Sequence, residues 1–340
     1  MKQRVDWLDV VKCFGIFAIY WCHYGVDGGH AYLAVIQYSV PLFFFASGCL
    51  ENFSKQESIL VGIGKIIRGI LVPWLFYCVI SVITHILETD CELLSLWVMI
   101  WKILAGTPKN EFVAWGLWFL TCMAVVKLIF LVLRRLNNKL LILSTCAVIF
   151  CAASYAVDLS EPKLPFNADI ALHYLWYFAV GYVAYPWIDR FLQTRKRTLR
   201  LLLAGSFCFS AMYSAYFYFG RNLFEGRLPG EFLQNTLYPF ASMMVLIWFQ
   251  IVLAYIFRDV VSFQKLGRNT LHLCGSEYLV RTFLNTVAGI VQIDARPHSS
   301  LASLFFTLIT LWWVNRYLVP VEKRILSEIQ KVPDYLMSKS

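Results

Sequence analysis

The chain has 340 residues, of which 59% are hydrophobic and 15% are charged, and its formal net charge is +9 at pH 7. Soluble globular domains average about 25% charged residues, so this composition excludes an ordinary soluble enzyme and indicates a polytopic membrane protein. The basic residues gather in short loops between apolar segments, where they report membrane orientation. We therefore expect no nucleic-acid partner.

The first apolar segment covers residues 8–26 and follows the basic residues Lys2 and Arg4. No small-residue cleavage site precedes a second hydrophobic region, so we expect this segment to stay as a membrane span. Further windows of about 20 apolar residues follow it. The sequence predicts an all-α bundle of about ten transmembrane helices, at 8–26, 31–50, 69–88, 112–133, 140–158, 170–189, 199–219, 235–257, 270–292 and 300–319.

The apolar segment 93–106 is short and carries Lys102. Counting it as a span moves the later basic loops outside, whereas leaving it out places every strongly basic loop in the cytoplasm. We therefore expect 93–106 to be re-entrant or interfacial, with both termini cytoplasmic. One integral membrane domain then covers 1–320, and a cytoplasmic tail covers 321–340.

The ten cysteines show no CxxC or other paired metal-ligand spacing, and most lie within the apolar spans. Cysteine in such surroundings behaves as a small hydrophobic residue. The sequence therefore gives no reason to infer a metal site or a disulfide framework.

Ionisable side chains inside spans cost about 2.5 to 3.5 kcal/mol at mid-helix, so each needs a partner, a water-filled cavity or a function. Lys127 lies near the inner end of its span and can extend to the headgroups. His85 and Glu88 lie at a water boundary. Structural roles account for all three.

Two further positions leave two interpretations open. Glu277 and Arg281 are four residues apart on one predicted helix and can neutralise each other, or Glu277 can belong to a site. His173 stands at the outer start of its span, four residues after Asp169. It can be a hydrogen-bonded interfacial histidine or a residue that supports the site.

The first span, within "RVDWLDVVKCFGIFAIYWCHYG", carries Asp9, Lys12 and His23. Lys12 and His23 are eleven positions apart, so on a helix they share nearly one face and lie about 16 Å from each other. A neutral imidazole near the outer end can take a proton from an alcohol. The alternative is a buried histidine bonded to a neighbouring helix.

Other stretches accompany this Lys12 and His23 pair: "SVPLFFFASGCL" at 39–50, "KIIRGILVPWLFY" at 65–77, "WGLWFL" at 115–120, "LPFNADIALHYLWYFAVGY" at 164–182 and "GRNTLHLCGSEYL" at 267–279. In these motifs and their order the chain resembles membrane acyltransferase family 3, the bacterial O-acetyltransferases of surface polysaccharides. It is most similar to the branch of the enterobacterial common antigen and fucose O-acetyltransferases. That family opens with Arg or Lys, ten residues and then His.

The chain departs from the family pattern at two positions. Lys12 stands where many members have Arg, which keeps the charge but loses the bidentate fork. Glu277 stands near where many members have a histidine, so no second catalytic histidine is carried over.

The resemblance implies acetyl-CoA as the acyl donor, no metal, and transfer of the acetyl group to a hydroxyl of a surface or lipid-linked glycan at a bacterial cytoplasmic membrane. It implies that Lys12 and Arg68, near the inner face, hold the anionic end of the donor. His23 then deprotonates the sugar hydroxyl or briefly carries the acetyl group. Substrate-binding or supporting roles are expected at Asp9, Asp169, His173 and Glu277.

A transporter or flippase of a lipid-linked glycan is the alternative function, because intramembrane charges also serve substrate binding and proton coupling. The sequence shows no inverted repeat and no clearly broken span, which favours the enzyme. It leaves open the acceptor sugar and its hydroxyl, acetyl against a longer acyl group, and the oligomeric state.

Overall fold

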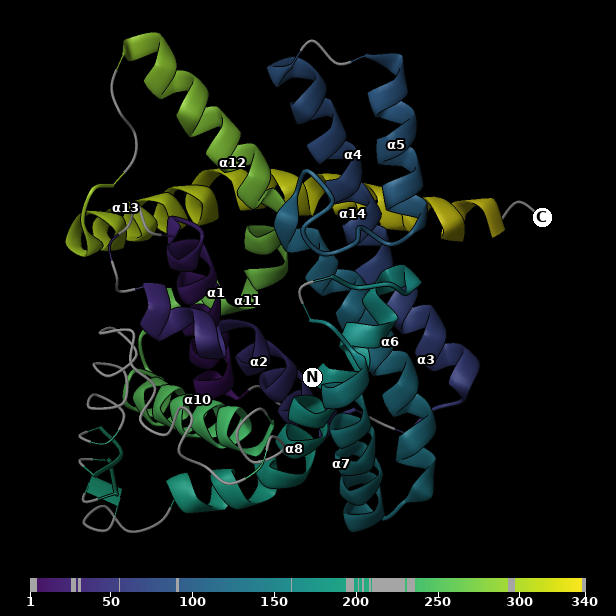
Figure 1. Ribbon diagram of the computed structural model, residues 1–340, viewed down its shortest axis with the longest axis vertical. Coiled ribbons are helices and arrows are strands. Elements are labelled where there is room, and N and C mark those ends of the chain that lie inside the picture. The colour runs from purple at the N-terminus through teal and green to yellow at the C-terminus, as the bar shows by residue number, and fades with distance from the viewer. Residues whose placement is uncertain are drawn as a thin grey trace. The chain divides into compact units, whose positions relative to one another are not determined.

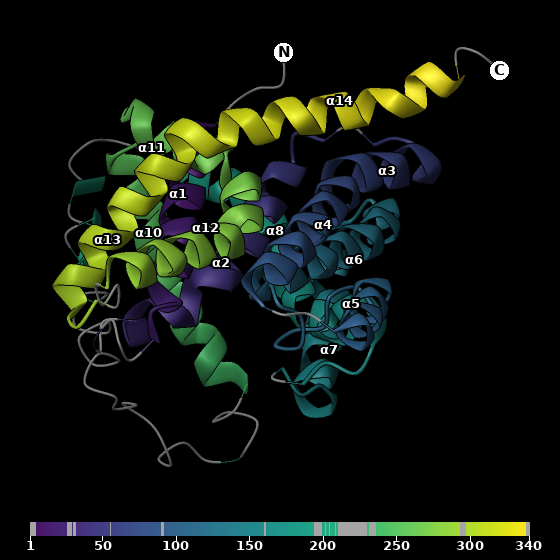
Figure 2. The same cartoon turned by 90° about the horizontal axis from the view of Figure 1, so that it is seen from above.

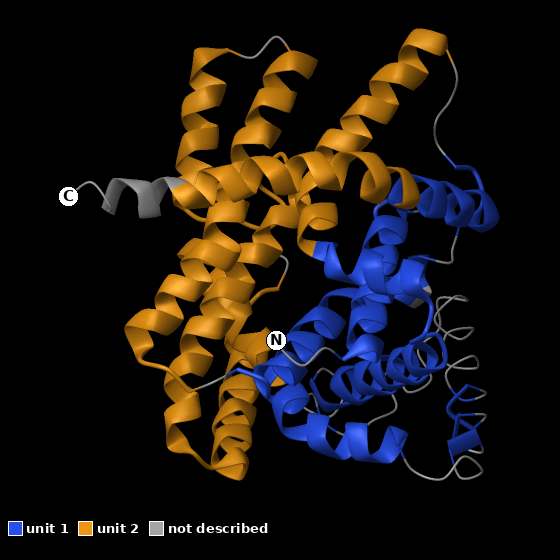
Figure 3. Cartoon of the chain, turned by 180° about the vertical axis from the view of Figure 1, so that it is seen from behind, with its two compact units in different colours: residues 1–54, 177–270, 296–311 blue, residues 55–176, 271–295, 312–340 orange. Residues whose placement is uncertain are grey.

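A computed structural model of the chain describes residues 5–25, 29, 32–54, 56–89, 92–159, 161–193, 199–200, 202–203, 205–207, 209, 230, 236–292 and 297–337 (Figure 1). This part of the chain is overwhelmingly helical and contains no strand. Two compact units share it: residues 1–54, 177–270 and 296–311 form unit 1, and residues 55–176, 271–295 and 312–340 form unit 2 (Figure 3). Their positions relative to one another are not determined.

Unit 1 is organised around the first two helices of the chain. Helix α1 (Asp6–Cys22) packs against α2 (Tyr32–Glu51), α10 (Tyr238–Ile256) and α11 (Val261–Arg268). The unit also holds the second part of α8 (Ala168–Leu192) and most of α13 (Ser300–Trp313).

Helices α2 and α8 approach each other through glycine. A Cβ atom on Gly48 would lie 1.9 Å from the carbonyl oxygen of Phe178, and one on Gly181 would lie 2.1 Å from that of Phe45. The Cys49 thiol also donates a hydrogen bond to the Gly181 carbonyl at 3.3 Å. Small residues at such crossings let the backbones of membrane helices come into contact.

Unit 2 begins with α3 (Ile59–Ile66), the π-helical turn η2 (Ile67–Leu71) and α4 (Val72–Glu88), which together form one helical stretch. It continues with α5 (Leu93–Leu104), η3 (Trp115–Leu117), α6 (Trp118–Leu133), η4 (Arg134–Leu136), α7 (Lys139–Ala156), η5 (Pro165–Asn167) and the start of α8. Helix α12 (Thr270–Val291), η7 (Val314–Leu318) and α14 (Val319–Met337) complete it. Its core contains Trp74, Tyr77, Leu117 and Leu326.

A buried asparagine joins the loops at one end of unit 2. The Asn167 amide donates hydrogen bonds to the Gly106 carbonyl at 3.1 Å and to the Thr121 hydroxyl at 2.9 Å. Its side-chain oxygen accepts one from the backbone N–H of Lys109 at 3.0 Å. The Lys109 ammonium group lies 5.2 Å from the centre of the Trp118 ring, and burial lowers its pKa. These contacts fix the segment that leads into α6.

Among the described residues, five helices are long and apolar enough to cross a membrane: Ile59–Glu88, Trp115–Leu136, Lys139–Ala156, Tyr238–Ile256 and Ser300–Lys331. The stretches Val35–Glu51 and Leu93–Leu104 are shorter apolar helices. The prediction of an all-α membrane bundle is confirmed. The predicted span at 199–219 falls mostly outside the described residues.

The structure forms helices at the segment 93–106 and across the predicted domain boundary at residue 320. The segment 93–106 holds α5, whose 12 residues extend about 18 Å at 1.5 Å per residue, short of the roughly 30 Å bilayer core. The helical stretch from Ser300 to Lys331 runs through the predicted domain boundary at residue 320. The orientation of α5, the cytoplasmic termini and the tail at 321–340 stay predictions.

Candidate functional site

The polar start of α1 forms an ionic cluster with the end of α11, inside unit 1. One carboxylate oxygen of Asp9 lies 2.8 Å from the Lys12 ammonium group, and the other accepts a hydrogen bond from Nε of Arg268 at 2.9 Å. Arg268 also donates through Nη2 to the Gln264 side chain at 2.8 Å. Asp6 lies at the edge of the cluster, with Oδ1 3.8 Å from the same nitrogen. A single carboxylate therefore positions two cations.

Backbone contact between the two helices brings Arg268 to this place. A Cβ atom on Gly267 would lie only 1.7 Å from the carbonyl oxygen of Asp9. Phe14 of α1 packs edge-on against Phe263, with ring centres 5.8 Å apart. The missing side chain at 267 thus lets α11 touch α1 at Asp9, and the next residue of α11 reaches the carboxylate.

The cluster is partly open to solvent or lipid. The side chain of Asp9 is 12% exposed, that of Lys12 is 19% exposed and that of Arg268 is 32% exposed. Partial exposure preserves access for an anionic ligand, while burial of the carboxylate strengthens its hold on both cations.

His23 ends α1 as its C-cap residue, and its backbone N–H donates to the Ile19 carbonyl at 3.2 Å. Since α1 is helical from Asp6 to Cys22 without interruption, the spacing between Lys12 and His23 corresponds to about 16 Å along nearly one face. The side chain of His23 is half-buried. One helix therefore carries the ionic cluster near its start and an imidazole at its end.

Two residues near His23, Trp21 and Tyr24, contact the first half of α13 within unit 1. The indole N–H of Trp21 donates to the Ser303 hydroxyl at 2.8 Å. The Tyr24 ring packs edge-on against Phe306, with ring centres 5.9 Å apart. These contacts fix the backbone around His23 and orient the end of α1.

Arg68 belongs to unit 2, where it lies exposed in the π-helical turn η2. Its backbone carbonyl accepts a hydrogen bond from the Gln330 side chain of α14 at 2.9 Å. Lys12 belongs to unit 1, so the structure does not decide whether the two cations share a donor site. That part of the sequence interpretation stays a prediction.

Asp169 caps the start of α8. One carboxylate oxygen accepts backbone N–H bonds from Lys163 at 2.6 Å and Leu164 at 3.2 Å, and the other accepts one from Ile170 at 2.9 Å. Anionic side chains are favourable at helix starts, where backbone N–H groups lack helical partners. These bonds give Asp169 a structural function, whatever further role it has.

His173 lies one turn further along α8, among aromatic rings. Its ring centre is 4.8 Å from that of Phe150 and 5.6 Å from that of Tyr174. The histidine is therefore held by packing inside unit 2, while His23 belongs to unit 1.

Glu277 is buried in α12, with 4% of its surface exposed. Its carboxylate faces the WGLW segment, since a Cβ atom on Gly116 would lie 3.7 Å from Oε2. The Cys274 thiol donates to the Gly116 carbonyl at 3.7 Å. The structure thus brings the motifs at 115–120 and 267–279 together at this carboxylate, and the pairing with Arg281 stays a prediction.

Unit 2 contains a polar cluster of its own, which the sequence does not predict. The Tyr77 hydroxyl of α4 donates to the Glu322 carboxylate of α14 at 3.0 Å and lies 2.8 Å from Nδ1 of His272 in α12. Tyr77 packs on Gly275, where a Cβ atom would lie 2.2 Å from its ring. Residues from three distant segments meet here, and sequence spacing carries no signal for such a cluster.

Arg268 was also missed as a site residue. It stands in the motif "GRNTLHLCGSEYL", within a basic loop whose charge predicts membrane orientation. Gly267, the residue before it, indicates that another helix packs closely at this point. The sequence does not show which helix that is.

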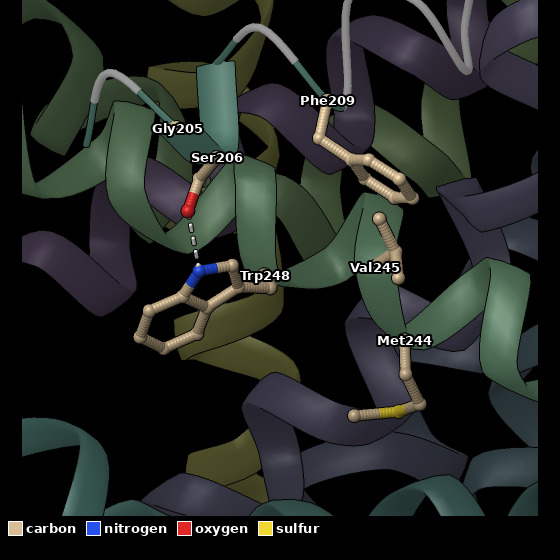
Figure 4. Close-up of a pocket in the computed structure, with 6 residues that line it drawn as sticks. All are labelled: Gly205, Ser206, Phe209, Met244, Val245 and Trp248. Carbon is tan, nitrogen blue, oxygen red and sulfur yellow. Dashed lines mark hydrogen bonds between the residues drawn. The ribbon is translucent and has the colours of Figure 1, made fainter. Parts of the chain in front are cut away.

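An apolar pocket of about 430 Å³ lies in unit 1 between α10 and the segment around residue 206 (Figure 4). Trp248 donates its indole N–H to the Ser206 hydroxyl at 2.9 Å across it. None of the described residues that line it is ionisable: they are Gly205, Ser206, Phe209, Met244, Val245 and Trp248. The pocket offers no acid or base for group transfer.

Comparison with known proteins identifies the family. Residues 5–317 match the acyltransferase domain of acyltransferase family 3, so the chain belongs to this family and is a membrane acyltransferase. No curated protein and no solved structure matches the chain. The family assignment confirms the resemblance to membrane acyltransferase family 3, and the branch within the family stays a prediction.

Proposed function

We propose that the protein moves an acetyl group from cytoplasmic acetyl-CoA to a hydroxyl of a surface or lipid-linked polysaccharide sugar, at the bacterial cytoplasmic membrane. It resembles the enterobacterial common antigen and fucose O-acetyltransferase branch of its family. The observation that carries the proposal is α1, which holds an ionic cluster near its start and His23 at its end.

The cations of the cluster suit the anionic end of the donor. Coenzyme A ends in phosphates, which Lys and Arg bind through charge-assisted hydrogen bonds. Lys12 supplies a point charge, and Arg268 supplies the planar guanidinium that Lys12 lacks. Asp9 holds both at 2.8 and 2.9 Å, so it acts as a positioning residue. Arg68 joins them as a donor-binding residue in this proposal.

His23 is the group that acts on the acceptor. Its neutral imidazole takes the proton of the sugar hydroxyl as the oxygen attacks the acetyl carbonyl carbon. The carbon–sulfur bond of the thioester then breaks, and the imidazolium returns its proton to the departing thiolate of coenzyme A. In the two-step variant the imidazole attacks the acetyl carbonyl carbon first, and the carbon–sulfur bond breaks to release the thiolate of coenzyme A. The sugar hydroxyl then attacks the acetyl-imidazole, the carbon–nitrogen bond breaks to restore the imidazole, and the hydroxyl proton passes to the thiolate.

Basic loops place the start of α1 at the cytoplasmic side and its end at the outer side. The donor is therefore expected near Lys12 and the acceptor near His23, about 16 Å further along the helix. The pantetheine arm of coenzyme A would follow α1 between these two levels. Asp169, His173 and Glu277 are assigned supporting roles.

Mass spectrometry of surface glycans from wild-type and deletion cells tests the proposal. Loss of one acetyl mass increment per modified sugar in the deletion strain, restored by the plasmid-borne gene, is the expected result. A longer acyl increment would correct the donor. Lost glycan export with acetylation intact would instead indicate a transporter or flippase.

A further inference from the structure

Helix α14 presents one face to the body of unit 2. Glu322, Leu326 and Gln330 follow at intervals of four residues and are buried or half-buried. The Glu322 carboxylate accepts a hydrogen bond from the Tyr77 hydroxyl at 3.0 Å, and the Gln330 side chain donates one to the Arg68 backbone carbonyl at 2.9 Å. Hydrogen bonds hold both ends of this face, and Leu326 packs in the core between them. These contacts determine which side of α14 faces the rest of unit 2.

The next face of α14 is apolar and exposed. Val321, Ile325 and Ile329 also follow at intervals of four residues, and they are 55%, 45% and 40% exposed. Figure 2 shows α14 at the edge of unit 2, with α3 and α4 on one flank and no other described helix of unit 2 on the opposite flank. Exposed apolar side chains in a regular row are stable in contact with lipid or with another protein surface, and not in water.

The remaining surface of α14 between residues 319 and 331 is basic. Lys323, Arg324 and Lys331 are exposed, and Glu328 pairs with Lys331 at 2.7 Å. Three exposed cations thus stand against one exposed carboxylate over 319–331. Adjacent apolar and basic faces are typical of helices that lie in the interface of an anionic membrane.

The turn before α14 has the composition of a membrane boundary. Trp312, Trp313 and Tyr317 are 60%, 41% and 54% exposed, and Arg316 is exposed beside them. Trp and Tyr are enriched where spans meet the headgroups. The apolar stretch of α13 therefore reaches the interface just before α14 begins.

The contacts of α14 with the rest of unit 2 lie near the starts of α4 and α12. Arg68 lies in η2, the turn that leads into α4, Tyr77 lies in the second turn of α4, and His272 lies in the first turn of α12. The basic loops before these helices place both beginnings at the cytoplasmic side. This level matches that of the inner headgroups.

We propose that α14 lies in the cytoplasmic membrane interface, with Val321, Ile325 and Ile329 in the acyl boundary and Lys323, Arg324 and Lys331 bound to anionic phospholipid headgroups. The family match ends at residue 317, so this membrane contact is a property of the segment beyond the shared domain. It does not depend on the proposed acetyl transfer.

A fluorescent amino acid at position 325 tests the depth of the helix. The full chain is reconstituted in nanodiscs of phosphatidylcholine and phosphatidylglycerol, and quenching by doxyl-labelled lipid is compared with quenching by aqueous iodide. Position 327, an exposed serine of the same helix, is the matched control. We expect lipid quenching at 325 and iodide quenching at 327.

Two outcomes of this measurement overturn the proposal. Iodide quenching at 325 equal to that at 327 would mean that α14 projects into water. Protection of 325 from both quenchers would mean that protein covers the stripe, and cross-linking between two chains at 325 would identify a second copy. Both outcomes are readable in a chain with an intact basic face.

The headgroup preference is tested by the K323Q/R324Q/K331Q variant. The measurement is the enrichment of phosphatidylglycerol over phosphatidylcholine among lipids that stay bound during purification from mixed nanodiscs. We expect a loss of about fivefold for each cation removed, whereas Glu328→Gln should keep or raise the enrichment. Unchanged enrichment in a folded triple variant would exclude the anionic-lipid contact. If the triple variant does not fold, the three single variants are measured instead.

Discussion

The carboxylate of Asp9 accepts a hydrogen bond from Nε of Arg268 at 2.9 Å, although the two residues are 259 positions apart in the chain. The same carboxylate holds Lys12 at 2.8 Å. The contact joins the first helix of the chain to the motif at 267–279, and it gives this membrane acyltransferase a guanidinium at the start of α1.

Replacing Arg268 should weaken donor binding. We expect Arg268→Gln and Lys12→Ala each to raise the dissociation constant for acetyl-CoA about tenfold, since a hydrogen bond between charged groups contributes about 1.5 to 3 kcal/mol. Lys12→Arg should keep part of the affinity because the charge remains. Calorimetric titration of the purified protein with acetyl-CoA measures these changes.

Arg258→Gln is the matched control for this prediction. Arg258 is 40% exposed and lies 3.8 Å from Asp259, outside the cluster, so its loss should leave the affinity unchanged. Wild-type affinity in both Arg268→Gln and Lys12→Ala would remove these residues from the donor site.

A side chain at position 267 should separate α11 from α1. The Cβ atom of Gly267→Ala would lie 1.7 Å from a backbone oxygen, so we expect a loss at or above the upper end of the usual 1 to 3 kcal/mol for overpacking. Gly289→Ala is the comparison, because no atom lies within 4 Å of a Cβ there and alanine favours a helix. Thermal unfolding in detergent measures the difference, and Gly267→Ala should melt at a lower temperature than Gly289→Ala. Equal melting temperatures would argue against the close contact.

The bond between Tyr77 and Glu322 should stabilise the docking of α14. Tyr77→Phe leaves a buried carboxylate without this donor, which typically costs about 1 to 3 kcal/mol or more. Adding Glu322→Gln should recover part of the loss, because the charge is removed. Tyr317→Phe, at an exposed tyrosine, should change little. Additive losses in the double-mutant cycle would contradict a direct interaction.

The membrane topology predicts that position 137 is cytoplasmic. Asn137 is exposed in the turn between α6 and α7, so a cysteine introduced there should react with an impermeant thiol reagent only after the cells are opened. Labelling of intact cells at 137 would mean that 93–106 crosses the membrane or that the N-terminus lies outside.

The fold class could be predicted because hydropathy over about 20 residues directly reports the bilayer requirement. The pairing of Asp9 with Lys12 was also within reach, since residues three apart are neighbours on a helix. Arg268 was not, because its place depends on which helix packs against Gly267. Sequence periodicity describes one helix at a time and does not identify its partner.

The sequence of α14 carries a signal for an amphipathic helix. Val321, Ile325 and Ile329 recur every four residues, which indicates one apolar face of a helix, whereas hydropathy and charge alone predict a cytoplasmic tail at 321–340. The cluster of Tyr77, His272 and Glu322 carried no comparable signal, because it joins three distant segments.

The central claim is that His23 acts on the acceptor. His23→Ala should leave folding and acetyl-CoA binding near normal while acetyl transfer falls by about 10² to 10⁴, the usual contribution of a general base. His173→Ala and His85→Ala, both in unit 2, are the controls and should be milder.

Transfer of labelled acetyl groups from acetyl-CoA to the native glycan in membranes, normalised to folded protein, tests this claim most directly. The account predicts turnover by His23→Ala at or below one hundredth of the wild-type value. Near wild-type turnover by the same variant would contradict it.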